Sequence, residues 1–162
     1  MSLLEPVQSE VPPGDMRRFY QIFFEETAEQ LTAMESLLLG IDLAQPAAEA
    51  IDAIFRAAHS IKGASATFGF GDMSALTHEA ESLLARVRKR ELALSAPMID
   101  LLLEAGDLLR AQLGCHRGEP GTPEDAAPLV ARLNALASGA GTTQPVAGQY
   151  GAGVVPVAAP AA

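Results

Sequence analysis

The sequence predicts an all-α fold: an antiparallel up-down four-helix bundle with an additional C-terminal helix. The 162-residue chain is rich in Leu and Ala, with no Trp and only two Tyr, and this composition favours helices over sheets. Apolar residues recur at three- and four-residue spacing in four long stretches, which is typical of amphipathic helices. Short turns join these stretches, so consecutive helices are expected to pack antiparallel.

The first helix is expected to run from a cap at Asp15 to about Leu39, with Gly40 as its stop. Its predicted buried face consists of Phe19, Ile22, Phe23, Leu31, Met34, Leu37 and Leu38. The second helix is expected to hold Pro46 in its first turn and to end near Gly69. Its predicted buried face consists of Ile51, Ile54, Phe55, Ala58, Ile61 and Ser65.

The third helix is expected to begin at Gly71–Asp72, with Asp72 as its cap, and to end in the basic run Arg86–Arg90. It should bury Met73, Leu76, Ala80, Leu83, Leu84 and Val87. Ser95 opens a fourth helix, whose inward residues are Ile99, Leu102, Leu103, Leu109 and Leu113. The segment 122–125 signals the start of a shorter fifth helix, which ends near Ala137 and packs against one end or side of the bundle.

These elements divide the chain into three parts. Residues 1–14 contain three prolines that follow no regular spacing, and they are predicted to be a flexible leader. Residues 15–137 form the helical bundle domain. Residues 138–162 have no charged residue and consist largely of Gly, Ala, Val and Pro, which predicts a flexible linker. A chain that continues from such a linker would be the N-terminal piece of a longer protein.

Charge and composition exclude several functions. The formal net charge of −9 argues against nucleic-acid binding, which requires clustered Lys and Arg, and favours protein partners. Cys115 is the only cysteine, so no internal disulfide can form and a reducing compartment is indicated. No apolar run reaches the roughly 18 residues that a membrane span requires. We therefore expect a soluble, cytoplasmic, monomeric domain.

The polar residues of the second and third helices suggest a site between them. A helix advances by about 100° per residue, so His59 lies about 100° from the buried Ala58, at the edge of the core. Glu81 has the same offset from Ala80. Because the two helices are antiparallel, either both side chains point into the shared groove or both point away. His78, three residues before Glu81, falls on the same polar side.

If both point inward, the pair has a defined chemistry. A carboxylate that accepts the Nδ1 proton of His59 fixes the tautomer and leaves Nε2 as the nucleophile. Lys62, one turn from His59, can offset negative charge on phosphoryl oxygens. Gly63 lets a partner approach the ring closely, at a cost of about 1 kcal/mol in helix propensity.

Three motifs carry a family resemblance: His59-Ser60-Ile61-Lys62-Gly63, then Thr67-Phe68-Gly69-Phe70, then His78-x-x-Glu81. Over most of residues 15–137 the chain resembles the histidine-phosphotransfer (HPt) domain of CheA-type chemotaxis histidine kinases. The resemblance implies that His59 is phosphorylated and that Lys62, His78 and Glu81 form its hydrogen-bonded surround. The family often has Gly-Gly-Ala-Gly after the lysine. Here Ala66 adds a methyl group to the expected docking face around Gly63, which bears on regulator preference.

The resemblance also implies a function in two-component signalling and a phosphorelay. His59 would accept the γ-phosphoryl group of ATP from a kinase catalytic domain, in cis or in trans, and pass it to an aspartate of a CheY- or CheB-like response regulator. No phosphate-binding glycine loop is present, so we expect no cofactor here, with ATP and Mg²⁺ bound by partner domains. This stretch would be part of a transferase, a histidine protein kinase, while itself acting as phosphoryl carrier and substrate.

Two alternatives belong to other classes. A metal-binding bundle could draw on His59, His78, Glu81, Cys115 and His116, although a lysine beside the site opposes a cation. A non-catalytic helical adaptor would explain the bundle and its acidity but not the motif around His59. The run Arg86–Arg90 could dock an acidic partner, but a solvated helix end is the simpler interpretation. Cys115 and His116 carry no motif.

Overall fold

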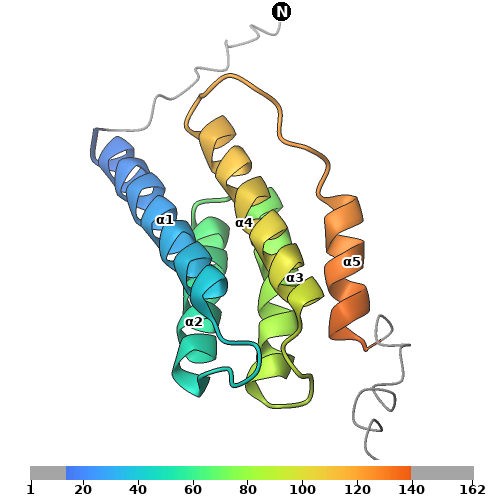
Figure 1. Ribbon diagram of the computed structural model, residues 1–162. Helices are drawn as coiled ribbons and strands as arrows, with labels where there is room; N and C mark the ends of the chain where they lie inside the picture. Colours follow the sequence, from blue (N-terminus) through green and yellow to red (C-terminus); the bar gives the residue numbers. More distant parts are fainter. Residues whose placement is uncertain (1–13, 140–162) are drawn as a thin grey trace, which may run out of the picture.

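The computed structural model describes residues 14–139, which form five helices and no strand (Figure 1). These are α1 (Gly14–Gly40), α2 (Ala48–Thr67), α3 (Gly71–Arg88), α4 (Ala96–His116) and α5 (Ala127–Ala137). Nearly all of the predicted leader and linker lies outside the described residues. Within residues 14–139, no helix combines the length and the apolar character that crossing a membrane requires.

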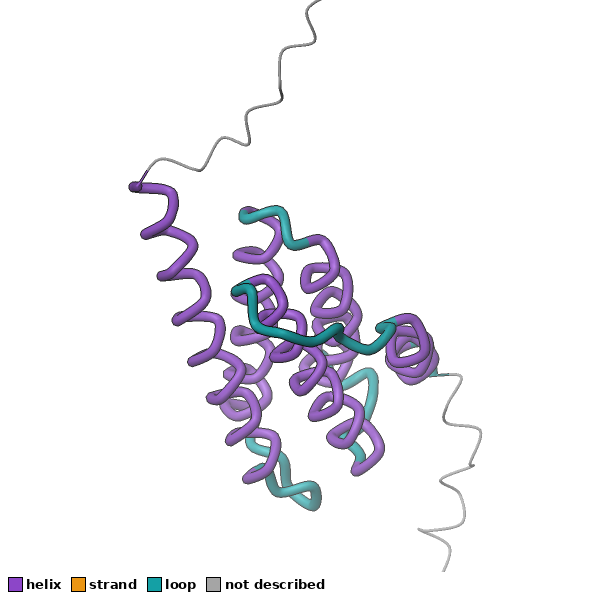
Figure 2. Tube along the Cα trace, turned by 90° about the horizontal axis from the view of Figure 1, so that it is seen from above, coloured by secondary structure: helices purple, strands orange, loops and turns teal. Residues whose placement is uncertain are grey.

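The first four helices form the predicted antiparallel bundle. Helix α1 packs against α2 and α4, and α3 packs against the same two helices, with the most extensive interface between α2 and α3. The fifth helix lies outside the bundle and contacts only α3 and α4 among the described helices. Seen from above, α1 and α5 lie on opposite sides (Figure 2). The fifth helix therefore covers a side of the bundle and does not close an end.

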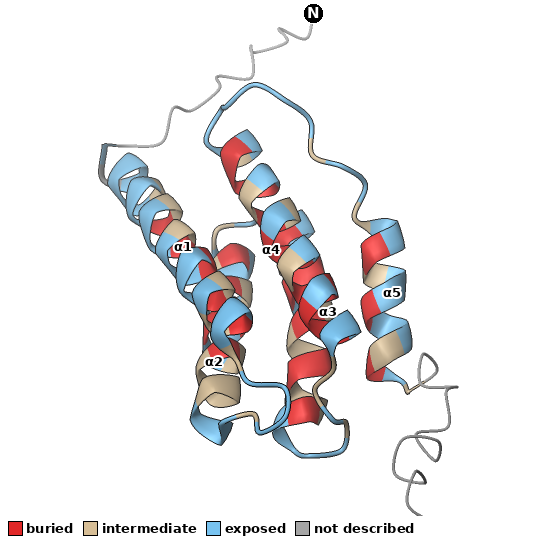
Figure 3. Ribbon diagram, viewed as in Figure 1, coloured by how far each residue is buried: buried red, intermediate tan, exposed pale blue. Residues whose placement is uncertain are grey.

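The apolar core lies between the helices, as the buried segments in Figure 3 show. The prediction for α3 is confirmed completely, since all six residues of its expected face are buried. Four residues expected inside on other helices are only half-buried at the margin of the core: Leu37, Ile51, Phe55 and Leu103. At these four positions the periodicity located the apolar stripe, but it could not tell the centre of a stripe from its edge.

The prediction for the first turns of α1 is wrong at two positions. Phe19 is 56% exposed and Ile22 is 39% exposed. The inward face of this segment instead passes through Tyr20, Phe23 and Phe24. A shift of one residue rotates a side chain by about 100° around the helix. Because the segment is apolar on several sides, spacing alone could not select the face that packs.

An aromatic cluster explains which face of α1 was selected. Tyr20, Phe23 and Phe24 meet Phe68 and Phe70, which flank the turn between α2 and α3, with ring centroids 4.8 Å apart for Phe23 and Phe68. Such tilted and edge-on pairs stabilise by about 0.5–1.5 kcal/mol beyond their area burial. The cluster ties the start of α1 to the turn that reverses the chain between the two helices of the site.

Gly69 makes that turn possible. Its φ of +80° lies in the left-handed region, where residues with a Cβ are strained. The Phe70 amide then donates to the Ser65 carbonyl over 2.9 Å, in the pattern of a Schellman helix end. This tight reversal sets α3 antiparallel to α2 and thereby fixes which residues of the two helices face each other.

Several predicted helix starts need correction. Helix α1 begins at Gly14, so Asp15 lies inside the helix. Pro46 precedes α2, which begins at Ala48. Helix α5 begins at Ala127, after the predicted signal at 122–125. Local capping residues mark a helix end only to within a turn, because competing turn conformations use the same residue types.

Asp72 does not cap α3, because the residue lies within the first turn of the helix. Its carboxylate instead accepts from Nε2 of His116, 2.8 Å away at the end of α4. The His116 ring also packs against Phe70, with the centroids 4.1 Å apart. His116, which the sequence suggested only as a candidate metal ligand, therefore joins the end of α4 to the start of α3.

Candidate functional site

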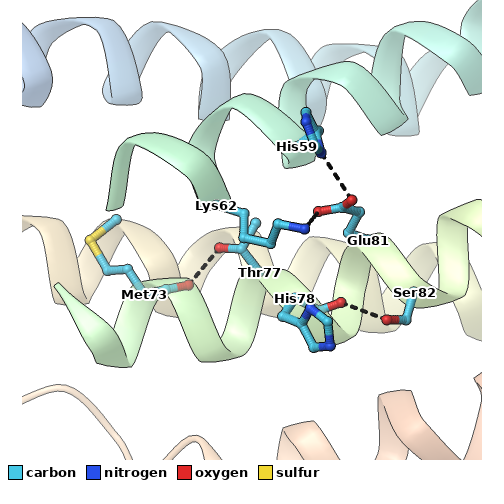
Figure 4. A network of polar contacts seen from close by, with 7 residues as sticks. All are labelled: His59, Lys62, Met73, Thr77, His78, Glu81 and Ser82. Carbon is cyan, nitrogen blue, oxygen red and sulfur yellow. Dashed lines mark hydrogen bonds and ion pairs between the residues drawn. The ribbon is translucent and has the colours of Figure 1, made fainter. Parts of the chain in front are cut away.

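His59 and Glu81 meet between α2 and α3 (Figure 4). Nδ1 of His59 lies 3.0 Å from Oε1 of Glu81, within hydrogen-bond distance. Of the two orientations that the sequence left open, the structure therefore has the one in which both side chains point into the shared groove. The imidazole lies on the side of the bundle, with 63% of the side chain exposed, whereas the Glu81 side chain is only 13% exposed.

Lys62 completes the cluster. Its Nζ lies 2.6 Å from Oε2 of Glu81, and its side chain is 27% exposed. Lys62 follows His59 by three residues, so both side chains leave α2 on one side, one turn apart. The two oxygens of Glu81 thus have different partners, the imidazole on Oε1 and the ammonium group on Oε2.

The cluster keeps Glu81 ionised. Partial burial by itself would raise the pKa of the Glu81 carboxyl, but hydrogen bonds from Lys62 and His59, together with their positive charges, outweigh it. The pKa of Glu81 therefore lies below its ordinary value of 4.5. An ionised carboxylate can only accept hydrogen bonds, so Nδ1 of His59 must be the donor. When the ring is neutral, its lone pair is then on Nε2, which ring geometry directs away from Glu81.

The lowered pKa of Glu81 predicts an acid-dependent loss of stability. A carboxyl whose pKa is lower in the folded than in the unfolded state stabilises the fold above the unfolded pKa, near 4.5. That contribution disappears as the pH falls through the folded pKa. We expect the free energy of unfolding to drop less steeply in Glu81→Gln than in the unmodified chain between about pH 6 and about pH 3.5. Urea unfolding across this range measures both slopes, and parallel curves would contradict the assignment.

His78 does not join the cluster. The resemblance implied that it takes part in the hydrogen-bonded surround of His59, but its ring is exposed and is directed away from the Glu81 carboxylate (Figure 4). Its side chain has no hydrogen bond or ion pair to any described residue. The physical reason is helical geometry: at about 100° per residue, Glu81 lies about 100° from the buried Ala80, whereas His78 lies about 160° from it and so faces solvent. His78 instead lines an open hollow beside Lys62 and Ala66.

Gly63 and Ala66, the predicted docking residues, are both exposed on α2. Apart from its chain neighbours and the backbone of its own helical turn, a Cβ atom added at Gly63 would meet no atom within 4 Å. The glycine is therefore not required by packing within this domain. Because glycine has no side chain, nothing projects from the surface next to His59 at this position, and a partner could approach closely there.

Three residues near His59 were not assigned to the site from the sequence. The Phe55 ring is stacked against the His59 imidazole, with centroids 6.1 Å apart and planes inclined by 14°. The Arg88 guanidinium lies 4.8 Å from the Phe55 ring centroid, and its Nε lies 2.6 Å from Oδ1 of Asp52. A signal was available in the spacing, because Asp52 and Arg88 each lie seven residues, two helical turns, from His59 and Glu81 respectively.

The prediction that the run Arg86–Arg90 is a solvated helix end therefore does not hold for Arg86 and Arg88. Besides the contacts of Arg88, the Arg86 side chain donates to the backbone carbonyl of Ala137 at the end of α5 and pairs with Glu91. Arg86 thus holds the fifth helix against α3. Both arginines therefore make contacts within the domain, and the pattern of charges along the sequence does not predict these contacts.

The residues considered for a metal site do not come together. His59 and Glu81 are adjacent, but His116 pairs with Asp72 at the end of the bundle. Among residues 14–139, no group of three or more His, Cys, Asp or Glu side chains is placed to hold a metal ion.

The chain is similar in sequence to known proteins. Residues 18–139 match the model of the Hpt domain family. Chemotaxis protein CheA of Klebsiella aerogenes is 47% identical over 103 residues, which cover 64% of this chain and 16% of that protein. Chemotaxis protein CheA of Salmonella typhimurium is 44% identical over 124 residues, covering 75% and 18%. The chain thus spans less than a fifth of the length of these relatives.

A solved structure resembles the fold. The phosphorylated P1 domain of CheA3 from R. sphaeroides, crystallised in complex with CheY6, has a TM-score of 0.66 and 26% sequence identity. The match covers 75% of this chain and 96% of that chain.

Proposed function

Because this chain belongs to the Hpt domain family, we propose that it carries a phosphoryl group on His59 in a chemotaxis phosphorelay. The observation that carries the proposal is the hydrogen bond from Nδ1 of this exposed imidazole to Glu81. It leaves Nε2 unprotonated on the open side of the ring, where a partner can reach it. A histidine buried in the core would have no such access.

The first step is attack on ATP bound in a kinase catalytic domain. The Nε2 lone pair forms a bond to the γ-phosphorus, the bond from that phosphorus to the bridging oxygen breaks, and ADP leaves. The ring becomes positively charged while its Nδ1 proton remains hydrogen-bonded to Glu81, whose carboxylate offsets that charge. Lys62 lies within one turn and offsets charge on the phosphoryl oxygens.

The second step passes the phosphoryl group to a response regulator. A carboxylate oxygen of an aspartate bonds to phosphorus as the Nε2–phosphorus bond breaks, and the imidazole returns to its neutral form. CheY- and CheB-like regulators are the proposed acceptors, and the similar P1 domain of CheA3 was crystallised with CheY6. ATP and Mg²⁺ are bound by the partner domains, in cis or in trans, and the relay operates in the cytoplasm.

Incubation with a CheA-type kinase domain and γ-labelled ATP tests this proposal. We expect one label per chain that is lost in acid and retained in base, as phosphohistidine is, and that moves to added regulators. Retention of a metal ion without label would indicate the metal-binding alternative. Neither label nor metal would favour a helical adaptor.

Gly63→Ala separates docking from stability. The methyl group would meet no atom within 4 Å beyond its chain neighbours and the backbone of its own helical turn, so the substitution should stabilise the helix by about 0.5–1 kcal/mol. The same methyl group stands on the surface beside His59, so we expect slower labelling by the kinase domain despite the higher stability.

Gly40→Ala is the matched control, because a Cβ there also meets no atom within 4 Å and the residue lies on α1. Thermal unfolding and initial labelling rates measure the two effects separately. Equal labelling rates for both variants and the unmodified chain would show that no partner approaches closely at Gly63.

A further inference from the structure

Helices α2 and α3 are joined by two polar contacts that repeat at the same interval. His59 meets Glu81 across the groove, and two helical turns away Asp52 meets Arg88, with 2.6 Å between Oδ1 and Nε. Since the helices are antiparallel, moving back along α2 corresponds to moving forward along α3. The second contact is too exposed to add much stability, because surface ion pairs typically contribute 0–1 kcal/mol. The position of the Asp52–Arg88 contact suggests a role other than stability.

Phe55 lies between the two contacts. Its ring is nearly parallel to the His59 imidazole, inclined by 14° at a centroid distance of 6.1 Å, within the range of offset aromatic stacking. The Arg88 guanidinium lies 4.8 Å from the centroid of the same ring, within the range of a cation–π interaction. Asp52 in turn holds Arg88. An unbroken series of contacts thus runs from Asp52 through Arg88 and Phe55 to the imidazole.

We propose that Phe55, held in place by Arg88, is a positioning residue that keeps the His59 ring in the plane in which Nδ1 meets Glu81. This inference rests on the proposed function of His59 and adds residues to it. One hydrogen bond fixes a single corner of an exposed ring and leaves rotation about that corner free. A stacked aromatic face restricts this rotation, so that Nε2 keeps its direction until a partner arrives.

The requirement for positioning follows from the exposure of the site. The His59 side chain is 63% exposed, so surrounding atoms restrain it less than they would in a core. Displacing a reacting group from its productive geometry slows a transfer step even when every reacting group is still present. Phe55 is half-buried and four residues before His59, so its ring is the anchored neighbour on the same face of α2.

The test compares Phe55→Leu, which keeps an apolar side chain without an aromatic face, with Phe55→Tyr, which restores the face. Arg88→Gln removes the cation from an exposed position without disturbing the core. Arg132→Gln is the matched control, since Arg132 forms an exposed ion pair with Glu104 over 2.8 Å on α5 and α4. Initial rates of labelling by the kinase domain and the ¹⁵N NMR spectrum of the neutral His59 ring are measured for each variant, with thermal unfolding as a check of the fold.

We expect labelling to slow about three- to tenfold in Phe55→Leu and about two- to fivefold in Arg88→Gln. The fraction of the ring protonated at Nδ1 should fall in the same two variants. Phe55→Tyr and Arg132→Gln should match the unmodified chain in both measurements. A residue with a merely structural role would lower the unfolding temperature and leave the tautomer fraction unchanged.

Unchanged tautomer fractions in Phe55→Leu and Arg88→Gln would overturn the inference, whatever the labelling rates. The NMR measurement needs no kinase. If Phe55→Leu folds poorly, the tautomer fraction of Arg88→Gln, whose substitution is at an exposed position, still decides the question. Absence of label on the unmodified chain, combined with altered tautomers in the variants, would reject the proposed function while leaving the positioning role intact.

Discussion

We expect His59→Gln to abolish labelling by a kinase domain, because no other side chain of the proposed site supplies the Nε2 nucleophile. Glutamine keeps a polar side chain of similar reach on α2, and 63% exposure of the original side chain means that the core is not disturbed. We therefore expect complete loss of acid-labile label with unchanged helicity by circular dichroism. Filter-bound radioactivity after a fixed incubation with γ-labelled ATP measures the first quantity.

His116→Gln provides the matched control. This histidine also hydrogen-bonds to a carboxylate, that of Asp72, but it lies at the end of α4 and not between α2 and α3. Its replacement should leave labelling in place, at the cost of the contact with α3. Label retained by His59→Gln, or lost only in His116→Gln, would mean that the phosphorylated group has been assigned to the wrong residue.

Glu81→Ala has the second largest expected effect. Without the carboxylate, nothing holds the proton on Nδ1, and the positive charge that develops on the ring during attack loses its counter-charge. At metal sites, loss of the carboxylate that orients a ligating histidine typically costs about 10- to 100-fold in metal affinity or activity, and Glu81 orients the His59 ring in the same way. We expect phosphorylation to slow by about that factor. Binding of a regulator should persist, because Glu81 is only 13% exposed and contributes little surface to a partner.

Rapid-quench measurement of the labelling rate and calorimetric titration with a purified regulator separate these two effects. Glu104→Ala, which removes an exposed carboxylate from its ion pair with Arg132, is the control for the change in net charge. A wild-type labelling rate in Glu81→Ala would remove the argument that the carboxylate selects the tautomer. Loss of regulator binding as well would show that Glu81 also shapes the docking surface.

Part of this site was predictable from local sequence, and part was not. His59, Lys62 and Gly63 are neighbours along one helix, so their mutual arrangement follows from helical geometry alone. The expected place of His78 in the hydrogen-bonded surround was wrong, because proximity to Glu81 along α3 does not reveal that the His78 ring faces solvent, away from the carboxylate (Figure 4). Similarly, Phe19 and Ile22 fit the apolar spacing, yet the aromatic cluster selected another face of α1.

The sequence by itself determined the five helices, the buried face of α3 and the residue types gathered around His59, because periodicity and short-range spacing are written into a single helix. Only the tertiary structure decided that His59 and Glu81 point toward each other, and that Phe55, Arg88 and Asp52 extend their contact along the groove. The physical reason is that the register between two antiparallel helices is set jointly by the turn at Gly69 and by packing across the whole interface. Neither helix carries that information alone.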